Sequence, residues 1–137
     1  MKVVFYGGRH FNNPFKLYEA FYLLQQDMGM AEIATTDEQG GPTVVAELAR
    51  GQAVACRVVP ALWRVHGVSA EAHRRVVLLE QAPDLVVLLP GGETDEMAVV
   101  CEAAGIDVWD LTSVPSIKLG DGSQVGEDEM PADEAVF

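Results

Sequence analysis

Basic residues, cysteines and long apolar runs are all scarce in this sequence. Its 137 residues include nine lysines and arginines against 21 aspartates and glutamates, two cysteines and 7% aromatic residues. No apolar run approaches the roughly 18 residues that a membrane-spanning helix needs, so no membrane partner is expected. Cys56 and Cys101 stand in apolar surroundings without CxxC spacing. They are expected to be buried, reduced thiols, and neither a disulfide framework nor a metal site is predicted.

The shortage of positive charge excludes one class of partner. The formal net charge is −12 at pH 7, whereas proteins that bind nucleic acids without sequence preference carry clustered lysines and arginines. The sequence therefore predicts no nucleic-acid partner. A small phosphorylated ligand stays compatible with this charge, because such a ligand needs only one or two local cations.

The negative charge is concentrated near the end of the chain. Residues 119–137 carry six acids and no bases, with glycines scattered among them, so an acidic, flexible tail is expected to follow a single domain of residues 1–118. A docking peptide is the alternative interpretation, because the tail also holds three apolar anchors: Met130, Val136 and Phe137. The start of the chain leads straight into an apolar run without a signal-peptide pattern, and the cytoplasm is the expected location.

A pattern of strand, turn and helix repeats along the domain. Short runs rich in valine and leucine alternate with segments whose apolar residues recur at helical spacing. The expected strands cover residues 2–6, 31–35, 53–59, 84–89 and 106–111. The expected helices cover residues 17–28, 42–50, 70–81 and 94–104, with Pro42 in a first turn, Ser69 as an N-cap and Gly105 as a C-terminal stop.

This alternation predicts the fold class α/β, as a Rossmann-like three-layer sandwich around a mainly parallel five-stranded sheet. Numbered along the chain, the strands are expected in the order 3-2-1-4-5. Strands 1 and 4 are then neighbours, and the order of the strands reverses between them. Ligands bind in such sheets at the carboxyl ends of the strands, next to the point of reversal.

Two glycine turns follow the strands that meet at this point. The run Val3–Tyr6 ends in Gly7-Gly8-Arg9, and the run Leu85–Leu89 ends in Pro90-Gly91-Gly92. Glycines let backbone N–H groups approach an anion closely, and a helix that begins after each turn adds its partial positive charge. The turns therefore predict one shared anion site. Ordinary tight turns are the alternative, with Arg9 facing solvent.

Neither turn matches a standard nucleotide motif. The GKS or GKT ending of a Walker loop is absent, and so is the GxGxxG fingerprint. The three histidines lack metal-ligand spacing, and only His10 adjoins a turn, as a candidate base or ligand contact. Trp63 is a candidate stacking surface for a base or ribose, or else a packing residue.

Three segments of this sequence together resemble those of the SLOG superfamily, and within it those of the small YspA/YpsA-related proteins. The resemblance rests on VVFYGGRHF at residues 3–11, on Trp63, Gly67 and Arg74, and on DLVVLLPGGET at residues 84–94. It implies a Rossmann-like domain that binds a nucleotide or a nucleotide-derived ligand, and that in some branches cleaves the N-glycosidic bond, as LOG phosphoribohydrolases do. The resemblance also implies that Arg74 is the helix arginine of the ligand site. The expected ligand-binding residues are Gly7, Gly8, Arg9, His10, Gly41, Arg74, Gly91, Gly92, Glu93 and Thr94.

Three departures from this family argue against catalysis. The middle glycine-rich turn at residues 39–43 lacks the usual aspartate, and the second turn lacks a glycine before Thr94. Where LOG enzymes place a catalytic glutamate, this chain has Met97. Glu96 is the remaining candidate catalytic carboxylate, although acids in a first helical turn commonly complement the helix dipole.

The sequence thus leaves three classes of function open. Binding or sensing of an ADP-ribose-like ligand or a nucleoside monophosphate, without turnover, is the preferred prediction. A nucleotide N-glycosidase is the second, and an interaction protein that has lost its ligand is the third. No cofactor is predicted, and a homodimer is compatible with the sequence.

Overall fold

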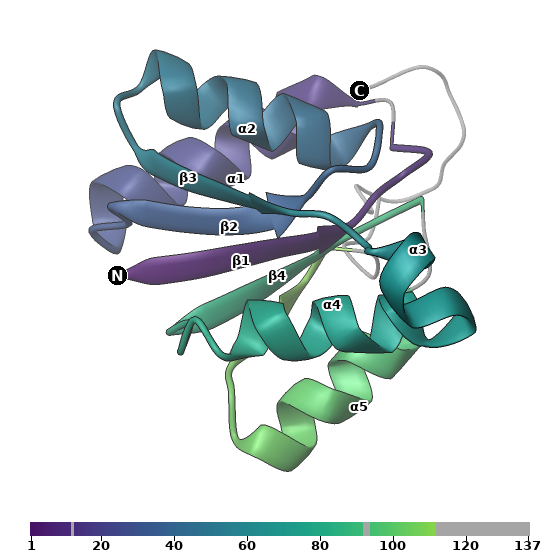
Figure 1. The fold of residues 1–137 in the computed structure, drawn as a ribbon. Coiled ribbons are helices and arrows are strands. Elements are labelled where there is room, and N and C mark those ends of the chain that lie inside the picture. Colours follow the sequence, from purple (N-terminus) through teal and green to yellow (C-terminus); the bar gives the residue numbers. More distant parts are fainter. Residues whose placement is uncertain (12, 92–93, 112–137) are drawn as a thin grey trace, which may run out of the picture.

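The computed structural model describes residues 1–11, 13–91 and 94–111. Strands and helices alternate in this part of the chain (Figure 1). The strands are β1 (Lys2–Gly7), β2 (Glu32–Thr36), β3 (Ala55–Val59), β4 (Leu85–Leu89) and β5 (Val108–Asp110). The helices are α1 (Pro14–Asp27), α2 (Gly41–Gly51), α3 (Trp63–His66), α4 (Ala70–Leu79) and α5 (Asp95–Ala104), with a 3-10 turn at Gly67–Ser69.

All five strands form one parallel sheet in the order β3-β2-β1-β4-β5. The α/β class, the parallel sheet and the strand order are therefore confirmed. β1 pairs with β4 along its length, from Val3 opposite Leu85 to Gly7 opposite Leu89. This register brings the ends of β1 and β4 together, so the two glycine turns begin side by side.

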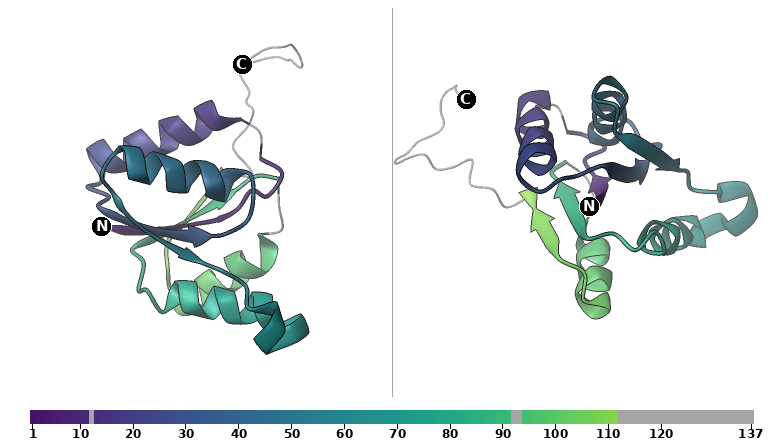
Figure 2. Two further views of the ribbon diagram at one scale, coloured as in Figure 1. Left: turned by 45° about the horizontal axis from the view of Figure 1, so that its top comes forward. Right: turned by 90° about the vertical axis from the view of Figure 1, so that its left-hand side faces the viewer.

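The sheet is covered on both faces, as a Rossmann-like sandwich requires. Helices α1 and α2 lie on one face, and α4 and α5 lie on the other (Figures 1 and 2). Alternate residues of β1 supply the two cores: Phe5 packs with Phe21 of α1, while Val4 packs with Leu78 of α4. Burial on both faces explains why β1 and β4 are continuous apolar runs.

Some boundaries differ from the expected ones. The short helix α3 was not predicted, because its four residues are too few to show a helical period. Ser69 occupies the N-cap position of α4, but its hydroxyl donates to the carbonyl of His66 instead of capping the helix. β3 begins at Ala55, because Ala53 takes a positive φ of 58°. Gly105 does end α5, in the expected left-handed conformation.

The tail boundary at residue 119, and the anchors proposed within the tail, lie outside the described residues. Among the helices of the described ranges, none is long and apolar enough to cross a membrane. The cytoplasmic location stays a prediction. Cys101 is buried as expected, whereas Cys56 is partly exposed, because β3 is an edge strand.

Candidate functional site

Three loops meet at the carboxyl edge of the sheet, after β1, β2 and β4. The carbonyl of Gly8 accepts hydrogen bonds from the amides of Phe11, at 2.9 Å, and Gly41, at 2.8 Å. The carbonyl of Gly91 accepts from the amide of His10, at 2.7 Å. The β1 loop is therefore tied to both neighbouring loops through backbone atoms.

Close approach between these loops requires the glycines. Gly7, Gly8, Gly40 and Gly91 all have φ between 80° and 89°. A Cβ at Gly40 would collide with the Gly8 carbonyl oxygen and would lie 2.6 Å from the Arg9 carbonyl oxygen. A Cβ at Gly7 would lie 2.5 Å from the methyl group of Thr94. Packing between the loops thus accounts for these glycines without any ligand.

This packing changes which backbone groups can receive a ligand. The amides of His10 and Gly41 already donate within the chain. Thr94 is buried at the N-cap of α5, and its side chain makes no capping hydrogen bond. Gly92 and Glu93, which were expected to bind the ligand, lie outside the described residues.

Arg74 is the centre of a charged cluster at the same edge. Its side chain is only 3% exposed, although it projects from α4 among carboxylates that solvent can reach. Nη1 lies 3.0 Å from Oδ1 of Asp37, and Nη2 lies 3.5 Å from Oε2 of Glu38. Nη2 also pairs with Glu71, one turn earlier on α4. The buried Nε of Arg74 has no hydrogen-bond partner among the described residues.

Arg9 reaches the same carboxylate from the β1 loop. Its Nη1 lies 3.9 Å from Oε2 of Glu38, and its side chain is 52% exposed. Two arginines that are 65 positions apart in the sequence thus face one carboxylate oxygen. The Glu38 carboxylate therefore occupies the place where Arg9 and Arg74 converge.

Tyr6 extends the cluster into the core. Its phenol donates a hydrogen bond to Oε2 of Glu71, whose other oxygen pairs with Arg74. Burial of this phenol, and the negative charge of Glu71 beside it, raise the pKa of Tyr6 well above the usual tyrosine range. Tyr6 is therefore a neutral donor that orients Glu71.

The sequence interpretation missed three of these carboxylates: Asp37, Glu38 and Glu71. A signal for two of them exists, because Asp37 and Glu38 directly follow β2, the position where dinucleotide-binding sheets place an acid that contacts ribose. Glu71 has no such signal. Its side chain comes into the site only because α4 packs against the sheet.

The other candidates take separate places. Glu96 lies at the start of α5, where its exposed carboxylate pairs with Arg75 at 2.9 Å. Met97, at the position of the LOG glutamate, is fully buried in the core. The side chain of His10 is exposed, and Trp63 is 59% exposed on α3.

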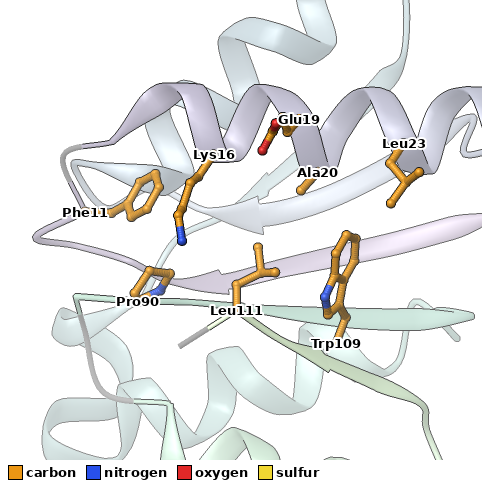
Figure 3. A pocket seen from close by; sticks show the side chains of 8 residues that line it. All are labelled: Phe11, Lys16, Glu19, Ala20, Leu23, Pro90, Trp109 and Leu111. Carbon is orange, nitrogen blue, oxygen red and sulfur yellow. The ribbon is translucent and has the colours of Figure 1, made fainter. Parts of the chain in front are cut away.

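A further cavity lies on the opposite face of the sheet from Arg74. A cavity of about 370 Å³ opens between α1 and the strands β4 and β5 (Figure 3). Its lining is mostly apolar, and the Trp109 ring points from β5 toward α1. Phe11 and Pro90 are the described loop residues that line it. Of the expected ligand-binding residues that the structure describes, none lines this cavity.

In the described ranges, no group of three or more histidine, cysteine, aspartate or glutamate side chains is arranged to hold a metal ion. Comparisons of the chain with protein-family models, with curated proteins and with solved structures found no match.

Proposed function

We propose that this protein binds a nucleotide or a nucleotide-derived ligand at the carboxyl edge of the sheet, over the loops that follow β1, β2 and β4. The observation that carries the proposal is the convergence of Arg9 and Arg74 on Oε2 of Glu38. Two guanidinium groups aimed at one oxygen suit a phosphate or carboxylate, which accepts charge-assisted hydrogen bonds from both.

In this proposal the Glu38 carboxylate occupies the place of the ligand's anionic group. Its distances of 3.5 and 3.9 Å from the two arginines are longer than ideal charge-assisted hydrogen bonds. Its side chain is 25% exposed, so solvent reaches the pair. An incoming phosphate can displace Glu38, and Arg9, which is half exposed, can follow the phosphate outward.

The balance of charge sets a limit on such a ligand. Arg9 and Arg74 supply two positive charges, and Arg75 adds a third beside Glu71, whereas Asp37, Glu38 and Glu71 supply three negative ones. The cluster has no excess of positive charge, so a ligand that also carries hydroxyl groups is favoured. Ribose hydroxyls can donate to carboxylates at the end of β2, as in dinucleotide-binding sheets.

Binding without turnover remains the preferred form of the proposal. The Glu96 carboxylate is paired with Arg75. Met97, which stands where LOG enzymes have a catalytic glutamate, is buried in the core and supplies no carboxylate. An N-glycosidase is a second candidate because one observation favours it: Glu38 and Glu71 both lie against Arg74, where a carboxylate could stabilise a ribosyl cation.

The test has two parts. Native mass spectrometry of the purified protein detects a retained nucleotide, and calorimetric titration with AMP, ADP-ribose and NAD measures its affinity. Arg9→Ala should weaken binding at least tenfold, because a charge-assisted contact contributes about 1.5–3 kcal/mol. Arg64→Ala, which removes an exposed arginine from α3, is the matched control.

Three results would change the assignment. If the wild-type chain binds none of these compounds, the interaction protein without a ligand replaces the proposal. If chromatography detects free base or ribose phosphate after incubation, and Glu38→Gln abolishes the release, the N-glycosidase is correct. Turnover that depends on Glu96 would instead restore Glu96 as the catalytic carboxylate.

A further inference from the structure

The outer face of α1 is unusually apolar for a helix on the surface of a domain. Leu17, Phe21 and Leu24 face the core, yet Phe15, Tyr18, Tyr22 and Leu23 remain between 37% and 75% exposed. The rings of Phe15 and Tyr18 meet edge to face, with centroids 6.0 Å apart.

These side chains border a continuous groove that runs along α1. The groove spans residues 13–27 and adjoins the cavity of Figure 3, with which it shares Lys16, Glu19 and Leu23. Phe15, Tyr18, Tyr22 and Leu23 lie in this groove beside polar and charged residues, and exposed apolar groups with a polar rim are typical of interaction sites.

Three charged side chains line the groove, namely Lys16, Glu19 and Asp27, and the two near its ends indicate which partner fits. Lys16 and Asp27 are 27 − 16 = 11 positions apart, close to three helical turns, so they lie on the same side of α1 near opposite ends. Both line the groove, and neither forms an ion pair with another described residue. A helix with this charge pattern complements an antiparallel copy of itself.

We propose that this groove is the interface of a homodimer in which the α1 helices of two copies pack antiparallel about a two-fold axis. Such an interface is isologous, so each contact occurs twice. If Lys16 lies opposite Asp27 of the partner subunit, position n lies opposite position 43 − n. Tyr22 then lies next to the axis and meets its own counterpart, while the helix dipoles are also antiparallel.

The test is sedimentation velocity over a concentration series at about 0.15 M salt, where the Debye length of about 8 Å screens the repulsion between two acidic chains. The wild-type chain should show a reversible monomer–dimer equilibrium. Tyr22→Glu should raise the dissociation constant at least tenfold, because it sets two like charges beside each other at the axis. Val99→Glu, at a 64% exposed residue on the opposite face of the sheet, should leave the equilibrium unchanged.

A charge reversal tests the register. Lys16→Glu should weaken the dimer, because it places two acids opposite each other, and Lys16→Glu combined with Asp27→Lys should restore it. Thermal unfolding of each variant checks that the domain itself remains folded, so that a lost dimer is not confused with a lost fold.

Three outcomes overturn the proposal. The first is a chain that stays monomeric at every concentration. The second is a dimer that Val99→Glu disrupts and Tyr22→Glu does not. The third is a full chain that is monomeric while a chain ending at Leu111 dimerises, which would mean that residues 112–137 cover the groove. Failure to bind nucleotides would leave the dimer proposal untouched, because no residue of the anion site takes part in it.

Discussion

Nη2 of Arg74 lies 3.5 Å from Oε2 of Glu38, and the arginine is 3% exposed while the glutamate is 25% exposed. A buried guanidinium is thus joined to solvent through a partly exposed carboxylate. The pair is both a structural contact and the proposed place of a ligand's anionic group. Substitution of Glu38 is therefore expected to change ligand binding, whereas substitution of Arg74 is expected to change stability.

Glu38→Gln should strengthen binding of AMP about tenfold. The change removes the charge that competes with phosphate for Arg9 and Arg74 but keeps the size of the side chain. Glu47→Gln, at an exposed position of α2, controls for the change in net charge. Calorimetric titration compares the two variants. Weaker binding by Glu38→Gln would mean that Glu38 contacts the ligand directly, through a hydroxyl group.

Arg74→Ala should lower the free energy of unfolding by about 3 kcal/mol. That value is near the low end for breaking a buried ion pair, because the partner carboxylates stay partly exposed. Arg9→Ala should cost less than about 1 kcal/mol, since Arg9 is half exposed and lies 3.9 Å from Glu38. Urea unfolding of both variants measures the contrast. Equal losses would contradict the structural role of Arg74.

Tyr6 should make the fold sensitive to alkaline pH. Its pKa is raised in the folded state, mainly by burial, so the unfolded chain loses this proton first as the pH rises. The stability that depends on it is complete below about pH 10, the ordinary pKa of tyrosine, and falls above it by about 1.4 kcal/mol per pH unit. Tyr6→Phe should remove this slope, and Tyr18→Phe, on the surface of α1, should not. Urea unfolding between pH 8 and 11 tests the difference.

Gly40→Ala should be more destabilising than Gly105→Ala. Both glycines have positive φ, 80° and 72°, so each substitution introduces backbone strain of about 1 kcal/mol or more. Only Gly40 also touches the backbone of Gly8 and Arg9, whereas nothing lies within 4 Å of a Cβ at Gly105. The collision should add about 1–3 kcal/mol. Similar melting temperatures for the two variants would show that the loops move apart at little cost in free energy.

The fold was predictable because the sequence carries it locally. β1 and β4 are buried on both faces and appear as uninterrupted apolar runs, and the helices between the strands show their period. Right-handed crossovers then leave few possible orders, of which 3-2-1-4-5 is the one observed. The short helix α3 escaped prediction because four residues cannot display a period.

The candidate site was predictable only in part. Glycines after β1 and β4 marked the correct edge of the sheet, since strand ends are visible as the ends of apolar runs. The same glycines did not reveal their packing against one another, because the bond from the Gly41 amide to the Gly8 carbonyl joins residues 33 positions apart. Of the carboxylates around Arg74, Asp37 and Glu38 had a signal in their position directly after β2, whereas Glu71 had none.

By itself, the sequence determined the alternation of strands and helices, the parallel sheet and the edge at which loops gather, because hydrophobic period and glycine position are local properties. Tertiary structure alone decided that Arg9 and Arg74 face Glu38, that Tyr6 orients Glu71 and that α1 keeps an apolar outer face. Those relationships depend on how helices pack across the sheet, and electrostatic pairing acts through space between residues that the chain keeps far apart.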